Sequence, residues 1–361
     1  MSTPEKQEDD TAVVGTVTAA FGAKNRERLI ARYFAQQAPG PCAASEAWTH
    51  VYRLLMWTDQ TTGLAHCYES DKCQPGKPWY ARSLAFHDWL STALHVLPAR
   101  LAHHMDWLFL RATEDLAAQA LGRVARTEQA TREQRLPYQG RGFPRPGEDP
   151  ELVAMIQDTL QDHLASPPPA ALWQTLVQQI RQYLMLENKR KNLVGEGFED
   201  VLAAIVRRTC AQAAPDVAAR RPLQDIPGFN PPKKNEKPNK VDLAIVRPGM
   251  RTLVTAKWSV RADREKQFAA DFGDYVQAES DGKPFEYVFV TNEFDPARLM
   301  RACDKLATNA PMFTHVVHIN TAALKATYRG SKESSMMRVL ELIDTGRLIS
   351  LERWLNLLQT N

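Results

Sequence analysis

The stretch that decides the fold runs from Val241 to Arg264 and reads VDLAIVRPGMRTLVTAKWSVRADR. Two short apolar runs rich in β-branched residues, 241–246 and 252–256, lie on either side of a break that contains Pro-Gly. Such runs are typical of strands, and Pro-Gly is typical of a turn. The pattern therefore predicts a β-hairpin. Folding the second strand back along the first brings Asp242 and Lys257 close together.

Downstream of this hairpin, helical and strand patterns alternate to the end of the chain. We expect a helix over 263–280, a strand at EYVFVTN (286–292), a helix over 295–307, a strand at THVVHIN (314–320) and C-terminal helices. Asp295 followed by Pro296 is a helix-start signal. The alternation predicts an α/β (α+β) fold with a mixed central β-sheet flanked by helices.

The upstream part of the chain is mostly helical in pattern. We expect helices over 26–37, 83–97, 101–129, 151–165 and 170–188, a separate helix from about residue 197, and a hairpin over 50–70 turning at 59–63. A loop rich in Pro, Gly and Arg at 135–150 is the expected domain boundary. The predicted organisation is a flexible N-terminus (1–24), a mainly helical accessory domain with a hairpin (25–150) and a second domain (151–361).

Composition limits the class of protein. The chain has 361 residues, 44% of them hydrophobic and 24% charged, and a net charge of +3. It lacks an apolar run of the roughly 20 residues that span a membrane, and its polar start is unlike a signal peptide, so we expect a cytoplasmic protein without a membrane partner. Five scattered cysteines favour reduced thiols. GEGFED lacks the Gly-Lys-Ser/Thr ending of a phosphate-binding loop, so no nucleotide cofactor is expected.

Asp242 and Lys257 are the first candidates for chemistry. Hydrolysis of a phosphodiester needs an activated water and a charge-stabilised leaving oxygen, and a hard cation held by carboxylates supplies both. The candidate ligands are Asp242, Glu199 on the preceding helix and one acid on the helix after the hairpin. Lys257 would stabilise the charge on the phosphate or position the water. The alternative is purely structural, since such residues are common at strand ends.

Arg261, Asp263 and Arg264 follow the lysine and form the second candidate set. Arginine matches the O6 and N7 acceptors of guanine, and aspartate can accept a hydrogen bond from cytosine N4 in the major groove. The set is therefore suited to reading G·C pairs, although a solvated helix start with internal salt bridges is the alternative. We expect Trp258, between the two sets, to be a core aromatic residue.

The segment TAKWSVRADR (255–264) resembles the signature of type II restriction endonucleases of the NgoMIV and SgrAI group, enzymes of the PD-(D/E)xK fold that cut around a CCGG core. In that group Ser or Thr stands two residues before the catalytic lysine, as Thr255 does here, and the missing acid comes from the following helix. The group continues Lys-Trp-(Ser/Thr)-x-Arg-Ser-Asp-Arg, which this chain matches at 257–259, 261, 263 and 264. GEGFEDVL resembles the helix with an additional active-site glutamate, here Glu199.

The resemblance implies a restriction-endonuclease-like core within 151–361 and a site-specific endonuclease that hydrolyses double-stranded DNA at a CCGG-like palindrome. It implies Asp242, Glu199 and Asp271 as metal ligands, Lys257 as the catalytic lysine and Arg261, Asp263 and Arg264 as base-reading residues. Asp271 stands where the group usually has Glu, and Glu265 is a nearer substitute; Val241 stands where Pro is common. The expected cofactor is Mg²⁺, with Mn²⁺ as a substitute. The expected assembly is a homodimer or homotetramer, since a palindrome matches a twofold axis.

Four lysines before the hairpin, Lys233, Lys234, Lys237 and Lys240, are candidates for contacts with the DNA backbone, with a solvated linker as the alternative. Two other functions remain open. One is a structure-specific or repair nuclease of the same fold, with the arginines on phosphates. The other is a DNA-binding protein whose catalytic site is impaired by Asp271.

Overall fold

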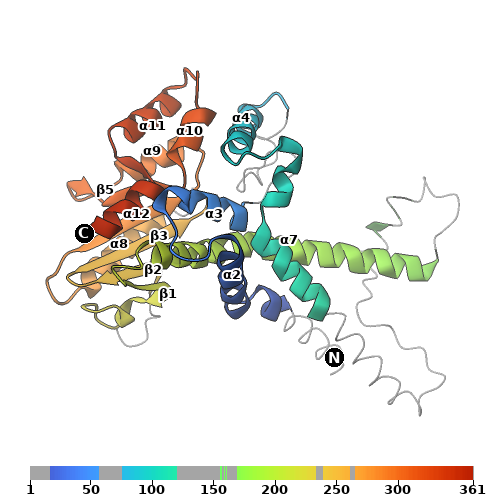
Figure 1. Ribbon diagram of the computed structural model, residues 1–361, viewed down its shortest axis with the longest axis horizontal. Helices are drawn as coiled ribbons and strands as arrows, with labels where there is room; N and C mark the ends of the chain where they lie inside the picture. Colours follow the sequence, from blue (N-terminus) through green and yellow to red (C-terminus); the bar gives the residue numbers. More distant parts are fainter. Residues whose placement is uncertain are drawn as a thin grey trace, which may run out of the picture. The chain divides into compact units, whose positions relative to one another are not determined.

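The computed structural model (Figure 1) describes residues 17–56, 75–119, 155, 156, 158, 160, 169–232, 239–260 and 265–360. It divides into two compact units, one formed by Met1–Arg26 with Leu110–Leu193 and the other by Glu27–Phe109 with Val194–Asn361. This division differs from the expected one, because Glu27–Phe109 belongs to the same unit as the hairpin. The boundary loop at 135–150 lies outside the described residues.

The expected flexible N-terminus falls partly on described residues. Residues 17–21 are helical, and Val17, Ala20 and Phe21 are buried. Their side chains therefore pack within the first unit, while residues 1–16 lie outside the described part of the chain. The prediction of a flexible segment does not hold for 17–21, because an apolar helical face was available there for burial.

A six-stranded mixed sheet forms the centre of the second unit, with strand order β1-β2-β3-β4-β7-β8. The strands are β1 (Asp216–Pro222), β2 (Lys240–Arg247), β3 (Met250–Lys257), β4 (Phe285–Thr291), β7 (His315–His318) and β8 (Leu348–Ser350). Strands β1, β2 and β3 pair antiparallel, whereas β3, β4, β7 and β8 pair parallel. Two short strands, β5 (Leu306–Ala307) and β6 (Ala310–Pro311), form a separate ribbon.

The predicted hairpin is confirmed as β2 and β3, which pair Leu243 with Val254 and Arg247 with Met250. Pro248 and Gly249 form the turn, and Gly249 has φ +77°, a conformation that glycine adopts at little cost. Proline followed by a glycine with positive φ is the pair that a type II turn favours. The Pro-Gly pair thereby sets the register that aligns Asp242 with the end of β3.

Helices flank the sheet, which confirms the predicted mixed α/β architecture. They are α8 (Glu265–Ala278), α9 (Pro296–Asp304), α10 (Thr321–Thr327), α11 (Ser334–Asp344) and α12 (Leu351–Thr360), and α9, α10 and α11 lie close together (Figure 1). Asp295 caps α9 as expected, accepting hydrogen bonds from the backbone N–H of Ala297 at 2.9 Å and of Arg298 at 3.2 Å.

Helix α8 is held on the sheet by aromatic contacts. Phe268 packs on Phe289 with ring centroids 5.2 Å apart, and Phe272 and Tyr275 pack on Tyr287 at 5.6 and 5.5 Å. Because residues 287 and 289 of β4 project from the same face of the sheet, α8 covers that face. This placement brings Asp271 toward the end of the hairpin.

The N-terminal elements of the second unit are helical. They include α2 (Ala23–Gln37), which begins in the first unit, η1 (Ala44–Glu46), α3 (Ala47–Leu55), α4 (Pro78–Ala93) and η3 (Pro98–His104). The expected hairpin at 50–70 is wrong in its first strand, because Ala47, Val51, Leu54 and Leu55 bury one face of α3 at helical spacing. Its second strand lies outside the described residues.

Helix α7 (Ala170–Thr209) is one continuous helix of 40 residues that crosses from the first unit into the second. Separate helices over 170–188 and from about residue 197 were expected, and the break between them is absent. Gly195 and Gly197 cost about 1 kcal/mol each relative to Ala but do not by themselves end a helix. Within the described part of the chain, neither α7 nor any other helix is long and apolar enough to cross a membrane. η5 (Leu223–Asp225) follows β1.

Candidate active site

Asp242 and Lys257 meet at the open end of the hairpin. Lys257 Nζ donates to Asp242 Oδ2 at 2.6 Å, and the same oxygen accepts from the Ala256 N–H at 2.9 Å and from Thr255 Oγ1 at 3.2 Å. Both side chains keep partial exposure, 20% for Asp242 and 28% for Lys257. A substrate can therefore approach this ion pair from solvent.

The two side chains project from one face of the sheet. Extending the pairing of Leu243 with Val254 by one step places Asp242 opposite Thr255, and residues 255 and 257 of a strand share a face. The parallel register continues that face to Thr291 of β4, which pairs with Lys257. The predicted convergence of acid and lysine is thus a direct result of register.

Glu199 reaches the same region from α7. Its neighbour Phe198 is fully buried and packs edge-on against Trp258, with ring centroids 5.3 Å apart. Trp258 directly follows the candidate lysine and is a core residue as predicted, at 3% exposure. The Phe198–Trp258 contact therefore fixes the part of α7 that carries Glu199 next to the end of β3.

The carboxylate of Glu199 is buried beside other charges. Burial, and after it the negative charge of Asp242, raises the pKa of Glu199 to about 7, against the opposing charges of Arg220 and Lys257. A shift of this kind arises where a carboxylate loses hydration next to another carboxylate. Glu199 and Asp242 are therefore electrostatically coupled.

Asp271 on α8 belongs to the same electrostatic group. Burial, followed by the charge of Asp242, raises the pKa of Asp271 to about 6, while Lys257 acts in the opposite direction. The described residues thus bring Asp242, Lys257, Glu199 and Asp271 into one region. Glu265, the alternative to Asp271, begins α8, but its side chain lies outside the description.

Arg220 of β1 holds Glu199 in place. Its guanidinium donates to Glu199 Oε2 at 2.9 Å, to the Glu196 carbonyl at 3.1 Å and to Asp200 Oδ1. Arg220 has φ +52°, a left-handed conformation that costs a non-glycine residue about 1 to 2 kcal/mol. A strained backbone that persists beside a candidate site is often part of the function of that site.

The acids fit Mg²⁺ in chemistry but are not assembled as a complete metal site. Carboxylate oxygens are the ligands that Mg²⁺ prefers. Burial and then repulsion from Asp242 raise the pKa values of Glu199 and Asp271, and a cation would relieve that repulsion. Among the described residues, however, no three Asp, Glu, His or Cys side chains are grouped closely enough to hold one metal ion. In this arrangement Glu199 is bound to Arg220 and Asp242 to Lys257. The assignment of Asp242, Glu199 and Asp271 as metal ligands stays a prediction.

The chain leaving β3 is anchored to the end of β4. The Trp258 carbonyl accepts from the Asn292 N–H at 3.0 Å, and Glu293 Oε2 accepts from the Val260 N–H at 2.7 Å. Asn292 and Glu293 are themselves fully buried, and Tyr52 Oη donates to Asn292 Oδ1 at 2.9 Å. These bonds fix the starting point of the segment that carries the predicted base-reading residues.

Several predicted site residues lie outside the described part of the chain. They are the base-reading set, Arg261, Asp263 and Arg264, and three of the backbone lysines, Lys233, Lys234 and Lys237. Lys240 is described: it is the first residue of β2, exposed, and two positions before Asp242. All seven assignments stay predictions.

Sequence reasoning missed Arg220, Asn292 and Glu293. DVAARRP (216–222) carries no strong strand signal, so β1 was not expected and Arg220 had no predicted place. Asn292 ends the predicted strand 286–292 and Glu293 follows it, where the carboxyl ends of parallel strands gather functional residues. Their place at the end of a predicted strand was the sequence signal that could have identified them as site residues.

No protein-family model matches the chain, and no curated protein matches it. A solved complex of the restriction endonuclease PspGI with substrate DNA resembles it at 12% identity and a TM-score of 0.31, covering 76% of this chain and 90% of that chain. A metal-depleted Ecl18kI in complex with uncleaved, modified DNA resembles it at 11% identity and a TM-score of 0.29, covering 92% of this chain and 82% of that chain. At TM-scores this low the likeness adds nothing to the assignment of the site, which rests on the residues themselves.

Proposed function

We propose that this protein is a Mg²⁺-dependent, site-specific DNA endonuclease of the restriction type that acts at a G·C-rich, CCGG-like palindrome. The observation that carries the proposal is the 2.6 Å contact between Lys257 Nζ and Asp242 Oδ2 at a partly exposed strand end. Glu199 and Asp271 approach this region from two different helices, and burial, followed by the charge of Asp242, raises the pKa of both. Perturbed acids that converge on one lysine are typical of a catalytic site.

In this proposal Asp242, Glu199 and Asp271 would hold the cation. When bound, Mg²⁺ activates a water and neutralises charge on the phosphate, and Mn²⁺ can replace it. For Glu199 to take part, its carboxylate must exchange its bond with Arg220 for the metal. Asp242 is better placed to bind the metal. The three hydrogen bonds described above all go to Oδ2, so Oδ1 is the oxygen that would bind the cation.

Lys257 would act directly on the substrate. Its ammonium group carries three donors, and one of them already holds Asp242. The other two can donate to a phosphate oxygen or to the attacking water. A positive charge fixed in this way stabilises the negative charge that builds up on the phosphate during hydrolysis.

Arg261, Asp263 and Arg264 would read the bases. Their segment begins at Val260, whose N–H is bound to the buried Glu293, so the start of the reading segment is fixed relative to Lys257. Cutting both strands of a palindrome would require a homodimer or homotetramer. Substituting Arg261 or Arg264 should then relax discrimination at one base pair, whereas a phosphate contact would weaken binding to all sequences alike.

Incubation of the full chain with plasmid DNA and Mg²⁺ tests the proposal. Discrete fragments whose ends share one G·C-rich palindrome support a site-specific endonuclease, and chelation of the metal should abolish them. A smear of random fragments, or cleavage only at junctions and flaps, would instead favour the structure-specific nuclease. Sequencing of the fragment ends separates these results.

A second candidate is a DNA-binding protein without cleavage activity. One observation favours it: no three metal-binding side chains are grouped among the described residues. Calorimetric titration of Mg²⁺ and Mn²⁺ into the protein, with and without duplex DNA, distinguishes the two. Metal binding that appears only with DNA supports the nuclease, whereas DNA binding with no metal binding in either case supports this second candidate.

A further inference from the structure

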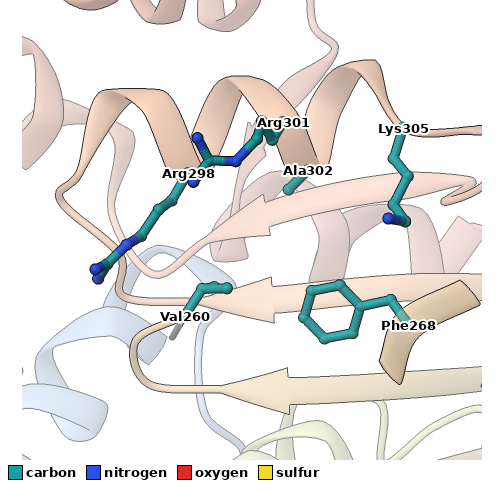
Figure 2. A pocket seen from close by; sticks show the side chains of 6 residues that line it. All are labelled: Val260, Phe268, Arg298, Arg301, Ala302 and Lys305. Carbon is teal, nitrogen blue, oxygen red and sulfur yellow. The ribbon is translucent and has the colours of Figure 1, made fainter. Parts of the chain in front are cut away.

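A pocket of about 210 Å³ lies between α9 and the chain that leaves β3. Arg298 and Arg301 of α9 and Lys305 directly after it line the pocket, and Val260 and Phe268 lie across from the helix (Figure 2). A buried water needs about 10 to 15 Å³ of such space, so the pocket can hold a group much larger than a single water. None of its residues belongs to the candidate active site described above.

Cations predominate in the pocket. Among the described residues that line it, three are cations and none is an acid, and Arg298 also forms an ion pair with the buried Glu293. Arg298 and Arg301 are three positions apart on α9, which places them on the same side of the helix, and Lys305 directly follows its last residue. Arg301, in the last turn of α9, is also favoured there by the helix dipole. An anion is the complementary ligand.

The rest of the lining is apolar. Val260 and Phe268 are each 2% exposed and Ala302 is 6% exposed, so these side chains form a dry wall facing the cations. A small inorganic ion would gain nothing from that wall. A phosphodiester joined to a sugar has an anionic group for the cations and carbon atoms for the wall, so it fits both halves of the pocket.

The pocket is close to the candidate active site along the chain. Val260 is three residues after Lys257, and three residues span at most about 11 Å. Arg298 lies on α9, the helix that follows β4, and the last residue of β4, Thr291, pairs with Lys257. Each DNA strand advances about 3.4 Å per nucleotide along the helix axis, so Val260 lies at most about three nucleotide steps from Lys257.

We propose that the pocket of Arg298, Arg301 and Lys305 binds a backbone phosphate of the DNA strand, within about three nucleotides of the phosphate at Lys257. This inference rests on the proposed function for the identity of the ligand. Arg298 also lies 3.6 Å from Glu293, which binds the Val260 N–H. The same contacts therefore link the phosphate pocket to the start of the predicted base-reading segment.

The test removes Arg301 and Lys305 and keeps Arg298, which forms the ion pair with Glu293. In a Lys257→Ala background, which is not cleavage-competent under the proposal, Arg301→Ala/Lys305→Ala is compared with the unaltered pocket by fluorescence anisotropy with a labelled duplex at a series of NaCl concentrations. The slope of log K against log[NaCl] should fall by about 1. Affinity at the lowest salt should fall about tenfold, the loss expected of a charge-assisted contact.

Lys325→Ala/Arg329→Ala is the matched control because it removes the same number of charges from another exposed surface. Lys325 and Arg329 lie in and just after α10, and neither lines the pocket. The conservative variant Arg301→Lys/Lys305→Arg should retain the original slope. If the double alanine variant fails to fold, Lys305→Glu against Lys325→Glu provides the same comparison with single changes.

A slope that falls in the pocket variant and not in the control supports the proposal. A slope equal to that of the control, or no binding of the duplex at all, overturns it. Cleavage of plasmid DNA by the wild-type chain is measured separately. Cleavage with an unchanged salt slope would refute the pocket alone, whereas a reduced slope without cleavage would refute the nuclease and leave the phosphate pocket standing.

Discussion

Arg220 lies opposite Asp242 in the pairing of β1 with β2, yet its guanidinium binds Glu199 on α7 at 2.9 Å. The register that pairs Ala219 with Leu243 and Arg221 with Val241 fixes this relationship. Arg220 thereby joins the strand next to the hairpin to the helix that carries the additional acid. It holds Glu199 beside Asp242, while Lys257 binds Asp242 itself.

Arg220→Ala should destabilise the fold by about 1 to 3 kcal/mol, because Glu199 and Asp200 lose their shared partner while remaining largely buried. It should also raise the Mg²⁺ concentration needed for half-maximal cleavage, since Glu199 is no longer held in place. Chemical denaturation and a Mg²⁺ titration of the cleavage rate measure the two effects. Arg221→Ala is the matched control: Arg221 binds the exposed Asp216, and its loss should change stability by less than about 1 kcal/mol.

Arg220→Gly separates the backbone of this residue from its side chain. Glycine adopts a positive φ without the cost that other residues incur. The glycine variant should therefore be more stable than Arg220→Ala by about 1 kcal/mol, although both lack the guanidinium. Equal stability of the two variants in urea denaturation would show that the left-handed conformation costs nothing at this position.

The stability of the metal-free protein should fall as pH rises from about 4 to 7. The pKa of Glu199 is raised to about 7 and that of Asp271 to about 6, so the folded chain binds more protons than the unfolded chain in this window, and deprotonation favours unfolding. The contribution of Glu199 is on the order of 3 kcal/mol. Denaturation at several pH values should show that Glu199→Gln/Asp271→Asn flattens this dependence. An unchanged slope in the double variant would contradict the two shifts.

Mg²⁺ should stabilise the protein more at pH 8 than at pH 5. Metal ligands must be deprotonated, and the raised pKa values of Glu199 and Asp271 place that deprotonation near pH 6 to 7. At a Mg²⁺ concentration 100 times the dissociation constant the gain is about 2.7 kcal/mol. Thermal unfolding with MgCl₂, compared with NaCl of equal ionic strength, measures this gain. The same rise at both pH values would point to a general salt effect.

The hairpin and its ion pair could be predicted because the information is local. Two β-branched runs and one Pro-Gly turn determine the register, and the register determines that Asp242 and Lys257 meet. The placement of Glu199 and Asp271 near them followed from the resemblance to the NgoMIV and SgrAI group. The presence of both acids in the electrostatic surroundings of Asp242 agrees with that expectation.

Other features depended on contacts between distant parts of the chain. Arg220 acquires its role only when β1 pairs with β2, and the sequence of β1 is too polar to indicate a strand. Residues 50–55 contain alternating apolar residues that suit a strand, yet α3 buries a helical face that includes Val51 and Leu54. Tertiary packing decided between two patterns that the local sequence allowed.

The most direct test of the central claim is the rate at which Lys257→Ala cleaves plasmid DNA with Mg²⁺. Lys325→Ala is the control, because it breaks another Lys–Asp pair, with Asp344 at 2.7 Å, on an exposed surface. The account predicts that Lys257→Ala cleaves about 100 to 1,000 times more slowly, while Lys325→Ala cleaves at the wild-type rate. Undiminished cleavage by a folded Lys257→Ala protein would contradict the assignment of this site.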